Sequence, residues 1–493
     1  MAIIATRLPS NPQTTRCLTP TEDRIASGER ALRDFITEHR KNGSGRSGGF
    51  AEFEERVMEL GRQVVRGAIA DELDHLAAEV DAEAIEIEGK TLRRVLRSKQ
   101  TYMTIAGPVE VERWLYKDRT DVAGKSVSAL DLHAAIVGGF WTPAAAKQGA
   151  WVVAQMTPGK AEELFSRVGN MGPSKTSLDR LPKELSGRWE ERREEFEAHL
   201  RATLVIPVEA TTVAVSLDGV MAPMEGTDPV EKRMQSARAG RTSKGPVGYK
   251  EFGVATLAFC NEAGETLTAV RFGRAPESKK TTLKGQLLMQ VMSALSKRPD
   301  LRVMKIADAG GDNWEFLETV CANSGQADGC VDFFHACEHL SAAIAAAYGD
   351  GTTETRFRAS ELRRALQEDH GGTTKVIRAL AYLAKKFPQR AVIKRELAYF
   401  RKQRHRMDYA DLRARGLPIG SGVVEAACKT LVTQRLKLSG QRWGSGGAQA
   451  ILTLRGWDQS DRFDEAWALL AATYHFEVHT LAHVIPIKKQ TSG

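Results

Sequence analysis

The sequence has few cysteines and no long hydrophobic run. Its six cysteines are scattered over 493 residues, which does not suit a disulfide framework and favours a reducing, cytoplasmic environment. No stretch reaches the ~20 consecutive apolar residues that a membrane-spanning helix needs. The first residues lack a basic segment followed by a long apolar one, so we expect no secretion signal. Secreted disulfide-rich and membrane-spanning proteins are therefore disfavoured.

Acidic residues are scarce in one long segment near the C-terminus. Between Lys394 and Arg442, twelve Lys or Arg residues stand against four Asp or Glu. This local excess equals the net charge of +8 of the whole chain, so the rest is nearly balanced. Such a segment favours an anionic partner such as nucleic acid, although a solvated helix face is the alternative.

A chain of this length predicts two to four domains. Residues 1–50 are rich in Pro, Ser and Gly and predict a loosely ordered N-terminus. Apolar spacing then predicts helices up to residue 84, followed by short strands at 85–88, 92–97, 102–105 and 109–115. Helix starts at Thr142-Pro143, Thr157-Pro158 and Gly172-Pro173-Ser174 suit a helix-turn-helix-like unit, with an ordinary helical bundle as the alternative. We assign residues 51–205 to an N-terminal DNA-binding region with mainly helices and a small β element.

The pattern changes after residue 205 to strands and helices in alternation. Strands are expected at 213–217, 251–259, 267–272, 303–307 and 330–334, and helices at 281–297 and 313–321. This order predicts an α/β domain with a mixed sheet. Residues 336–415 read as an all-α insertion, residues 416–475 return to the α/β domain, and residues 476–493 form a C-terminal tail.

Three acidic residues carry the chemistry that we expect. Asp218 and Asp308 each follow an apolar strand, and strand ends at one edge of such a sheet line a shared crevice. Glu425 follows a Gly-Ser-Gly turn and falls in the first turn of a helix. Carboxylates suit Mg²⁺ or Mn²⁺, and two such ions can promote in-line displacement at phosphorus. Each acid also has a purely structural explanation: Asp218 and Asp308 as turn residues, and Glu425 as an acid at a helix N-terminus. Asp228 and Asp312 are rival candidates for the first and second positions of the triad.

Several stretches resemble the ISKra-type insertion-sequence transposases, which are distantly Mutator-like DDE transposases. The stretches are VSLDGV (215–220), IADAGGDNW (306–314), DFFHACEHL (332–340) and GLPIGSGVVEAACKTLVTQRLKLSGQRW (416–443). The resemblance spans roughly residues 85–470. It implies a ribonuclease-H-like catalytic core interrupted by the helical insertion, and a metal-binding catalytic triad of Asp218, Asp308 and Glu425. It further implies DNA as the partner, a homo-oligomer on that DNA, and a cytoplasmic, nucleoid-associated bacterial protein.

The same resemblance points to further site residues. Asp332-Phe-Phe-His335 matches an Asp-x-x-His element, which implies that His335 shapes the edge of the active site. The alternative is a structural role, in which His335 only closes the end of a strand. The side chains that we expect to contact DNA lie in the basic segment and at one helix start: Lys429, Arg435, Lys437, Arg442, Trp443 and Lys175. Trp443 and Trp314 could stack on unpaired bases, although core packing is the simpler expectation for Trp314.

Two other functions fit parts of the sequence. His335-Ala-Cys-Glu338-His339 fits the H-x-x-E-H pattern of a zinc metalloprotease, but the pattern is short and no third ligand follows it. A catalytically inactive, transposase-derived DNA-binding protein is the other alternative. The retention of all three acids argues against it.

Overall fold

The computed structural model describes residues 24–41, 49–121, 124–169, 171–226, 234–235, 237–240, 248–320 and 327–481. By internal packing the chain divides into two compact units. Unit 1 comprises residues 1–149, 158–178 and 471–493, and unit 2 comprises residues 150–157 and 179–470. Residues 179–205, which the sequence suggests as part of the N-terminal region, therefore pack with unit 2. Among the described residues, no helix is both long and apolar enough to cross a membrane.

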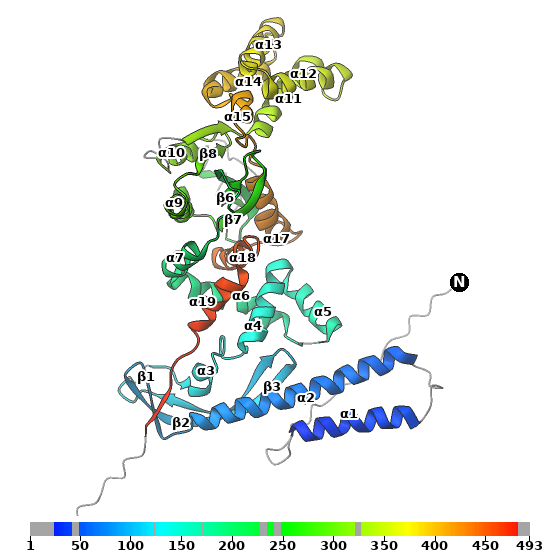
Figure 1. The fold of residues 1–493 in the computed structure, drawn as a ribbon, viewed down its shortest axis with the longest axis vertical. Coiled ribbons are helices and arrows are strands. Elements are labelled where there is room, and N and C mark those ends of the chain that lie inside the picture. Colours follow the sequence, from blue (N-terminus) through cyan, green and yellow to red (C-terminus); the bar gives the residue numbers. More distant parts are fainter. Residues whose placement is uncertain are drawn as a thin grey trace, which may run out of the picture. The chain divides into compact units, whose positions relative to one another are not determined.

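Unit 1 is built on a long helical hairpin and a five-stranded sheet (Figure 1). In chain order its elements are α1 (Arg24–Lys41), α2 (Gly49–Glu79), β1 (Ala84–Ile87), β2 (Lys90–Thr104), β3 (Gly107–Lys117), β4 (Val127–Ser128), α3 (Ala129–His133), the start of α4 (Pro143–Gln155), α5 (Pro158–Val168), the start of α6 (Lys175–Glu191) and β10 (His479–Leu481). The sheet order is β10-β1-β2-β3-β4, and all neighbours are antiparallel.

Three expectations for unit 1 are wrong. Residues 24–41 are not loosely ordered, because they form α1, which packs on α2 through an ion pair of Arg24 with Asp74 at 2.6 Å. The two strands expected at 92–97 and 102–105 are one strand, β2, which pairs with β3 along its length. The expected tail begins instead as ordered chain, since β10 pairs with β1. Residues 1–23, 42–48 and 482–493 lie outside the described residues.

Unit 2 contains the second five-stranded sheet. Its elements are α7 (Arg193–Thr203), β5 (Thr212–Pro223), β6 (Tyr249–Cys260), β7 (Thr266–Arg274), α9 (Thr281–Lys297), β8 (Arg302–Ala307), α10 (Gly311–Val320), β9 (Ala327–Val331), α11 (Phe333–Tyr348), α12 (Thr353–Glu368), α13 (Gly372–Lys386), α14 (Ala391–Gln403), α15 (Tyr409–Ala414), α16 (Gly422–Ala427), a π-helical turn η3 (Cys428–Thr433), α17 (Gln434–Leu436), α18 (Ser445–Asp458) and α19 (Phe463–Ala472). Single turns of 3-10 helix, η1 (Ser278–Lys280) and η2 (Arg404–Arg406), precede α9 and α15. The predicted α/β class, the mixed sheet and the helical stretch after β9 are confirmed.

The sheet of unit 2 has the order β7-β6-β5-β8-β9. Strands β5, β6 and β7 are antiparallel neighbours, whereas β8 and β9 run parallel to β5. Strand β5 is central, and Val213, Val215 and Leu217 are fully buried. Helix α9 packs on β6 and β7 from one side, and Leu283 and Leu287 of that helix belong to the same core.

A second core lies on the other side of the sheet. Val254 of β6 packs there with Val424, Ala427 and Leu431 of α16 and η3. Directly paired residues of neighbouring strands point to the same face. Asp218 is the register partner of Val254, so its side chain lies on the face that α16 and η3 cover.

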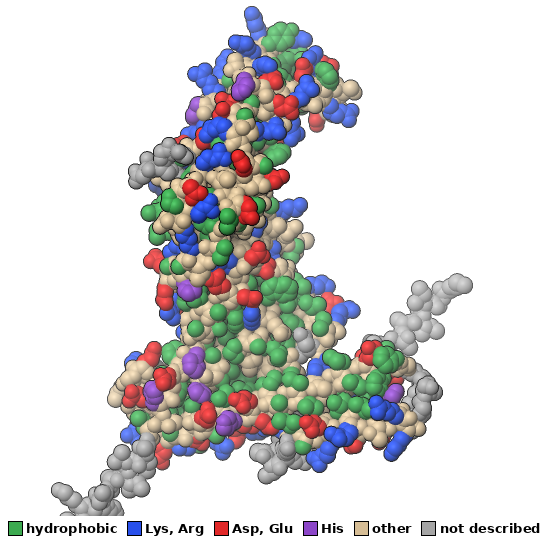
Figure 2. Space-filling model, viewed as in Figure 1, with side chains coloured by type: hydrophobic (Ala, Val, Ile, Leu, Met, Phe, Trp, Pro, Cys, Tyr) green, Lys and Arg blue, Asp and Glu red, His purple; other side chains and the backbone are tan. Residues whose placement is uncertain are grey.

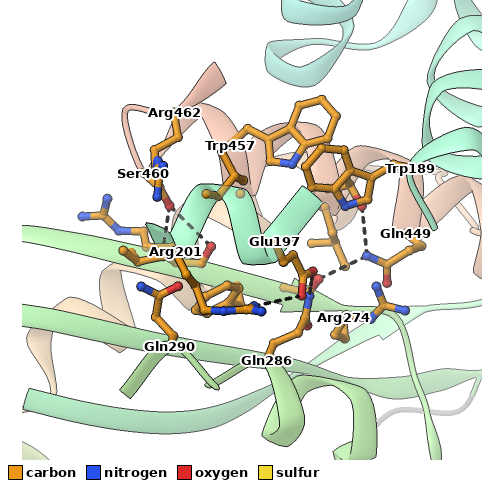
Figure 3. Close-up of a pocket in the computed structure, with 18 of the residues that line it drawn as sticks. Trp189, Glu197, Arg201, Arg274, Gln286, Gln290, Gln449, Trp457, Ser460 and Arg462 are labelled. Carbon is orange, nitrogen blue, oxygen red and sulfur yellow. Dashed lines mark hydrogen bonds and ion pairs between the residues drawn. The ribbon is translucent and has the colours of Figure 1, made fainter. Parts of the chain in front are cut away.

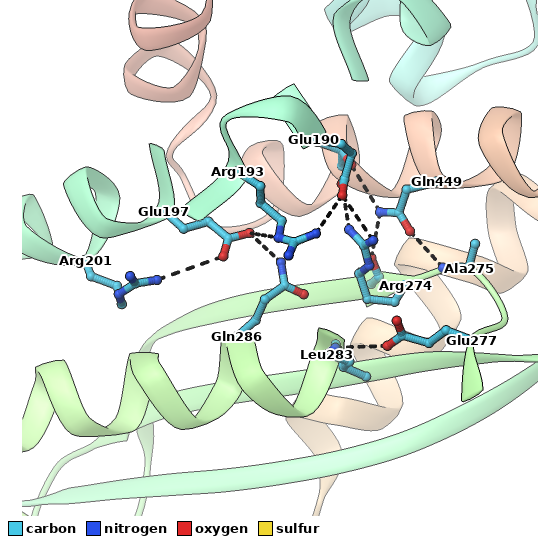
Figure 4. A network of polar contacts seen from close by, with 12 residues as sticks. Glu190, Arg193, Glu197, Arg201, Arg274, Ala275, Glu277, Leu283, Gln286 and Gln449 are labelled. Carbon is cyan, nitrogen blue, oxygen red and sulfur yellow. Dashed lines mark hydrogen bonds and ion pairs between the residues drawn. The ribbon is translucent and has the colours of Figure 1, made fainter. Parts of the chain in front are cut away.

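A polar network joins α6 and α7 to the edge strand β7 (Figure 4). Arg274 donates from both terminal nitrogens to the Glu190 carboxylate, at 2.6 and 3.1 Å, and Arg193 donates to the same carboxylate at 2.8 Å. Beside them Glu197 accepts from Gln286 at 2.5 Å. Only 13% of the Arg274 side chain is exposed, so solvent screens the Arg274–Glu190 pair weakly. Two-pronged arginine–carboxylate bonds of this kind fix geometry as well as charge.

We therefore expect Arg274→Ala to destabilise unit 2 by about 1–3 kcal/mol, because it leaves a half-buried carboxylate with one fewer partner. The measurement is the thermal midpoint of unfolding. The matched control is Arg358→Ala on α12, whose ion pair with Glu354 is about half exposed and should contribute little. Equal shifts for both variants would contradict a special role for the network.

Candidate active site

The three predicted carboxylates come from three distant segments of unit 2. Asp218 lies on β5, Asp308 follows the last residue of β8, and Glu425 lies in α16. The structure corrects one detail: β5 does not end at Asp218-Gly219 but continues to Pro223, because its pairing with β6 continues that far. The parallel pairing with β8 stops at Ser216–Ile306, so Asp218 lies just beyond the end of that partner strand.

Asn313 links Asp308 to the central strand. Its side-chain amide lies 3.2 Å from the carbonyl oxygen of Leu217 and 3.4 Å from the Asp308 carboxylate. Trp314 donates its indole N–H to the Asp308 carbonyl at 2.6 Å. Both residues belong to the start of α10, so this helix holds the segment after β8 in place. Trp314 is 4% exposed, which confirms that it packs in the core.

Glu425 is brought to the same region by the segment that follows the helical insertion. The Phe333 N–H donates to the Ile419 carbonyl at 3.0 Å, so this returning segment runs beside the start of α11. Asp332, which is 1% exposed, accepts from the Ser421 N–H and, at 2.6 Å, from the His335 N–H. Asp332 is thus the N-cap of α11 and the anchor of the turn before α16.

Steric contacts explain why two positions of the returning segment, 416 and 420, are glycine. Gly416 has φ +67°, and a Cβ there would lie 1.9 Å from the Glu262 carbonyl oxygen. A Cβ at Gly420 would lie 2.9 Å from the ring of Phe334. A side chain at Gly416 would push this segment away from the loop after β6, and a side chain at Gly420 would push it away from α11. The Gly-rich motif therefore serves to position the start of α16, where Glu425 lies in the first turn as predicted.

The electrostatics show that the carboxylates influence one another. Burial raises the pKa of Asp218, and the nearby charge of Asp308 raises it further, while bonds from the Gly219 N–H and the Cys428 thiol oppose the shift. Burial also raises the pKa of Glu425, with added contributions from Asp332 and Asp218. Carboxylates that repel one another in this way favour a cation between them.

The donor set suits a hard divalent cation. Oxygen ligands from two or three carboxylates, completed by water and phosphate, are what Mg²⁺ prefers. Asp218, Asp308 and Glu425 could supply them, and Lys280, whose Nζ lies 3.4 Å from the Asp218 carbonyl oxygen, is a cation at this position. Over the described ranges no three His, Cys, Asp or Glu side chains are already gathered around one point.

The raised pKa of Asp218 leads to a prediction about stability. In the unfolded chain the pKa of the Asp218 carboxyl is about 3.9. Because the pKa is higher in the folded protein, the folded protein binds the carboxyl proton more tightly. The stability of the fold therefore decreases as the pH rises from the unfolded pKa through the folded pKa. Asn lacks this charge. We expect Asp218→Asn to have a higher thermal midpoint than the wild type near pH 7 with chelator present, and the same midpoint near pH 3. A destabilised variant at neutral pH would mean that the charged carboxylate is structural.

His335 is on α11, not at a strand end. Its Nε2 lies 3.2 Å from Nε2 of His339, and His339 Nδ1 lies 2.5 Å from Glu396 of α14. The ring of His339 is stacked on Tyr399, with centroids 3.7 Å apart. The sequence did not predict the contact with Glu396 and Tyr399, because these residues are about 60 positions away and form no motif with the histidines.

The residues expected to contact DNA divide into two groups. Lys429, Lys437, Arg442 and Lys175 are exposed, and Trp443 is half-buried with its indole N–H donating to Leu436. Arg435 does not fit a DNA contact: it is 1% exposed and donates to the Val153 carbonyl, and burial lowers its pKa to about 10. Arg435 lies on α17, directly after η3, and its side chain points into the interior. Figure 2 shows many Lys and Arg side chains over α12–α14.

A separate hollow of about 620 Å³, part of it open to solvent, lies between α6, α7, β7, α9 and α18. Trp189 and Trp457 pack together on its wall, with centroids 4.5 Å apart (Figure 3). None of the three carboxylates lines it. Its charged side chains already have partners within the protein, as Arg274 has Glu190 and Arg462 has Glu465, so we do not regard it as the reaction site.

No protein-family model matches the chain, and a comparison with curated proteins gives no match either. Function has to be inferred from the residues themselves. The four described cysteines are free and buried.

Proposed function

We propose that this chain is a DNA transposase that cuts and joins phosphodiester bonds with a ribonuclease-H-like core. The fold assignment is supported by the sheet order, with three antiparallel strands followed by two strands parallel to the central one. The helix between the third and fourth strands and the helical insertion before the last acid also fit it. The observation that carries the proposal is that contacts join the three segments: Asn313 links the Asp308 carboxylate to the Leu217 carbonyl beside Asp218, and the Cys428 thiol, three residues after Glu425, donates to the Asp218 carboxylate.

In this proposal Asp218, Asp308 and Glu425 hold Mg²⁺ or Mn²⁺. When bound, two such ions supply Lewis-acid activation of the attacking and leaving oxygens at phosphorus. Asp218 would contribute an oxygen ligand to the ions, while Asn313 keeps Asp308 near β5 and Asp332 keeps Glu425 on its turn. A water molecule first cleaves the strand at the end of the mobile element. The freed 3′-hydroxyl then attacks a phosphodiester of the target DNA in line, so that a new P–O bond forms while the target strand's own 3′-oxygen leaves as a hydroxyl.

Binding of DNA is assigned to the exposed basic side chains. Lys429, Lys437 and Arg442 follow Glu425 in the chain, and the insertion helices add further positive charge. Phosphate contacts of this kind give an affinity that falls steeply with salt. Two ends must be joined, so a homo-oligomer on DNA is part of the proposal.

The test is strand cleavage on the chain's own neighbouring DNA. The substrate is a linear fragment that holds the gene and a few hundred base pairs on each side. We expect discrete nicks with 3′-hydroxyl ends on both flanks in Mg²⁺ or Mn²⁺, and none in Ca²⁺ or chelator. Specific binding without cleavage would favour the inactive DNA-binding alternative. Absence of both would overturn the proposal.

A further inference from the structure

Two histidines of α11, His335 and His339, lie with their rings close together. His335 and His339 lie one turn apart on α11, and their Nε2 atoms are 3.2 Å apart. The ring planes are nearly perpendicular, at 88°. The Nε2 atoms therefore converge on one point beside the helix.

The opposite nitrogen of each ring faces a carboxylate. His339 Nδ1 lies 2.5 Å from Glu396 of α14, which is 1% exposed and also pairs with Arg395. His335 Nδ1 lies 3.5 Å from Glu338. A carboxylate at Nδ1 keeps the proton there and leaves the Nε2 lone pair free to bind a metal ion. The arrangement thus provides two Nε2 lone pairs that point toward each other.

The spacing matches a pair of ligands on one metal ion. Two imidazole nitrogens at about 2.0–2.1 Å from a tetrahedral Zn²⁺ ion are about 3.3–3.4 Å apart. We propose that His335 and His339 bind a borderline transition-metal ion such as Zn²⁺. Nitrogen ligands select such ions over Mg²⁺, so this site is chemically distinct from the three carboxylates.

The surroundings leave room for further ligands. The side chains of His335 and His339 are 36% and 28% exposed, so water or a phosphate oxygen can complete the coordination. Stacking on Tyr399 holds the His339 ring in its orientation. Cys337, between the histidines in sequence, is buried in the core and does not contribute. The ion would tie α14 of the helical insertion, through Glu396, to the start of α11.

The test is direct metal binding by the full chain, without DNA. After removal of chelator, Co²⁺ is titrated and its visible absorption bands are recorded, since Co²⁺ replaces Zn²⁺ and reports nitrogen ligation. We expect about one Co²⁺ per chain, displaced by Zn²⁺ and not by Mg²⁺. His335→Gln and His339→Gln should abolish the bands, and Glu396→Gln should weaken binding about 10–100-fold. His370→Gln, an exposed histidine of the insertion, is the matched control and should bind like the wild type.

A simple hydrogen bond between the two imidazoles is the competing account of the 3.2 Å contact. It predicts no Co²⁺ bands, or bands that persist in the double variant while circular dichroism shows a folded protein; either result overturns the proposal. If the variants fail to fold, Cu²⁺ electron paramagnetic resonance on the wild type decides, because hyperfine coupling to two imidazole nitrogens is required. These readouts are independent of strand cleavage, so failure here leaves the proposed transposase activity untouched.

Discussion

Under the proposed function, replacing Asp218 by asparagine is expected to reduce metal-dependent strand cleavage by about a thousandfold or more, because the metal site would lose one of its carboxylate ligands. Such a loss corresponds to about 4 kcal/mol of transition-state stabilisation. DNA binding should change little, since asparagine has nearly the same shape and the phosphate contacts are made elsewhere. The measurement is the cleavage rate at saturating Mg²⁺, together with the affinity for the same fragment at fixed salt.

The matched control for this experiment is a carboxylate nearby that is not in the triad. Asp312, in the first turn of α10, is the rival for the role of Asp308. We expect Asp308→Asn to be as damaging as Asp218→Asn, and Asp312→Asn to retain most of the activity. Loss of DNA binding in the Asp218 variant would make that residue structural. Full activity in it would remove the basis for the metal site.

Removal of the Asp332 side chain is expected to have the second large effect. Asp332→Ala leaves the Ser421 and His335 N–H groups without their acceptor in a buried position. Each orphaned donor costs about 1–3 kcal/mol, so a total loss of about 2–6 kcal/mol is expected for the two. Cleavage should fall as well, because the turn before Glu425 loses its anchor.

Hydrogen–deuterium exchange can localise this effect. Faster exchange is expected at residues 417–425 and at the first turn of α11, with the sheet of unit 2 unchanged. Asp332→Asn retains one acceptor oxygen and should show a smaller change. Asp300→Ala is the control, since Asp300 forms an exposed pair with Arg298 that should contribute little. Uniform destabilisation across unit 2 would argue against an anchor specific to this turn.

Periodicity and turn residues predicted most of the elements of unit 2. The sequence predicts elements that have a local signal, such as apolar spacing, flanking turn residues or an acid after a strand. Examples are the helices at 281–297 and 311–320 and the strand at 302–307. The position of Asp308 after β8 followed from the same signal. Glu425 was likewise placed correctly in the first turn of a helix, because the Gly-Ser-Gly turn marks where that helix starts.

The features that sequence reasoning missed depend on long-range contacts. The extension of β5 to Pro223 is set by pairing with β6, which no local pattern encodes. The burial of Arg435 follows from a carbonyl acceptor at Val153, nearly 300 residues away. The same holds for Asp332, which looked like part of an Asp-x-x-His motif but holds the turn before α16.

The π-helical turn η3 has one more consequence. The helix from Gly422 to Leu436 is continuous, yet residues 428–433 take a wider turn than the 3.6 residues of an α-helix. Such a turn holds one residue more than an α-helical turn and leaves the residues beyond it in register. Cys428, which donates to Asp218, and Arg435, which donates to Val153, therefore keep these contacts from the two ends of the wider turn. The turn thus fits the number of residues in this segment to the two contacts that fix its ends.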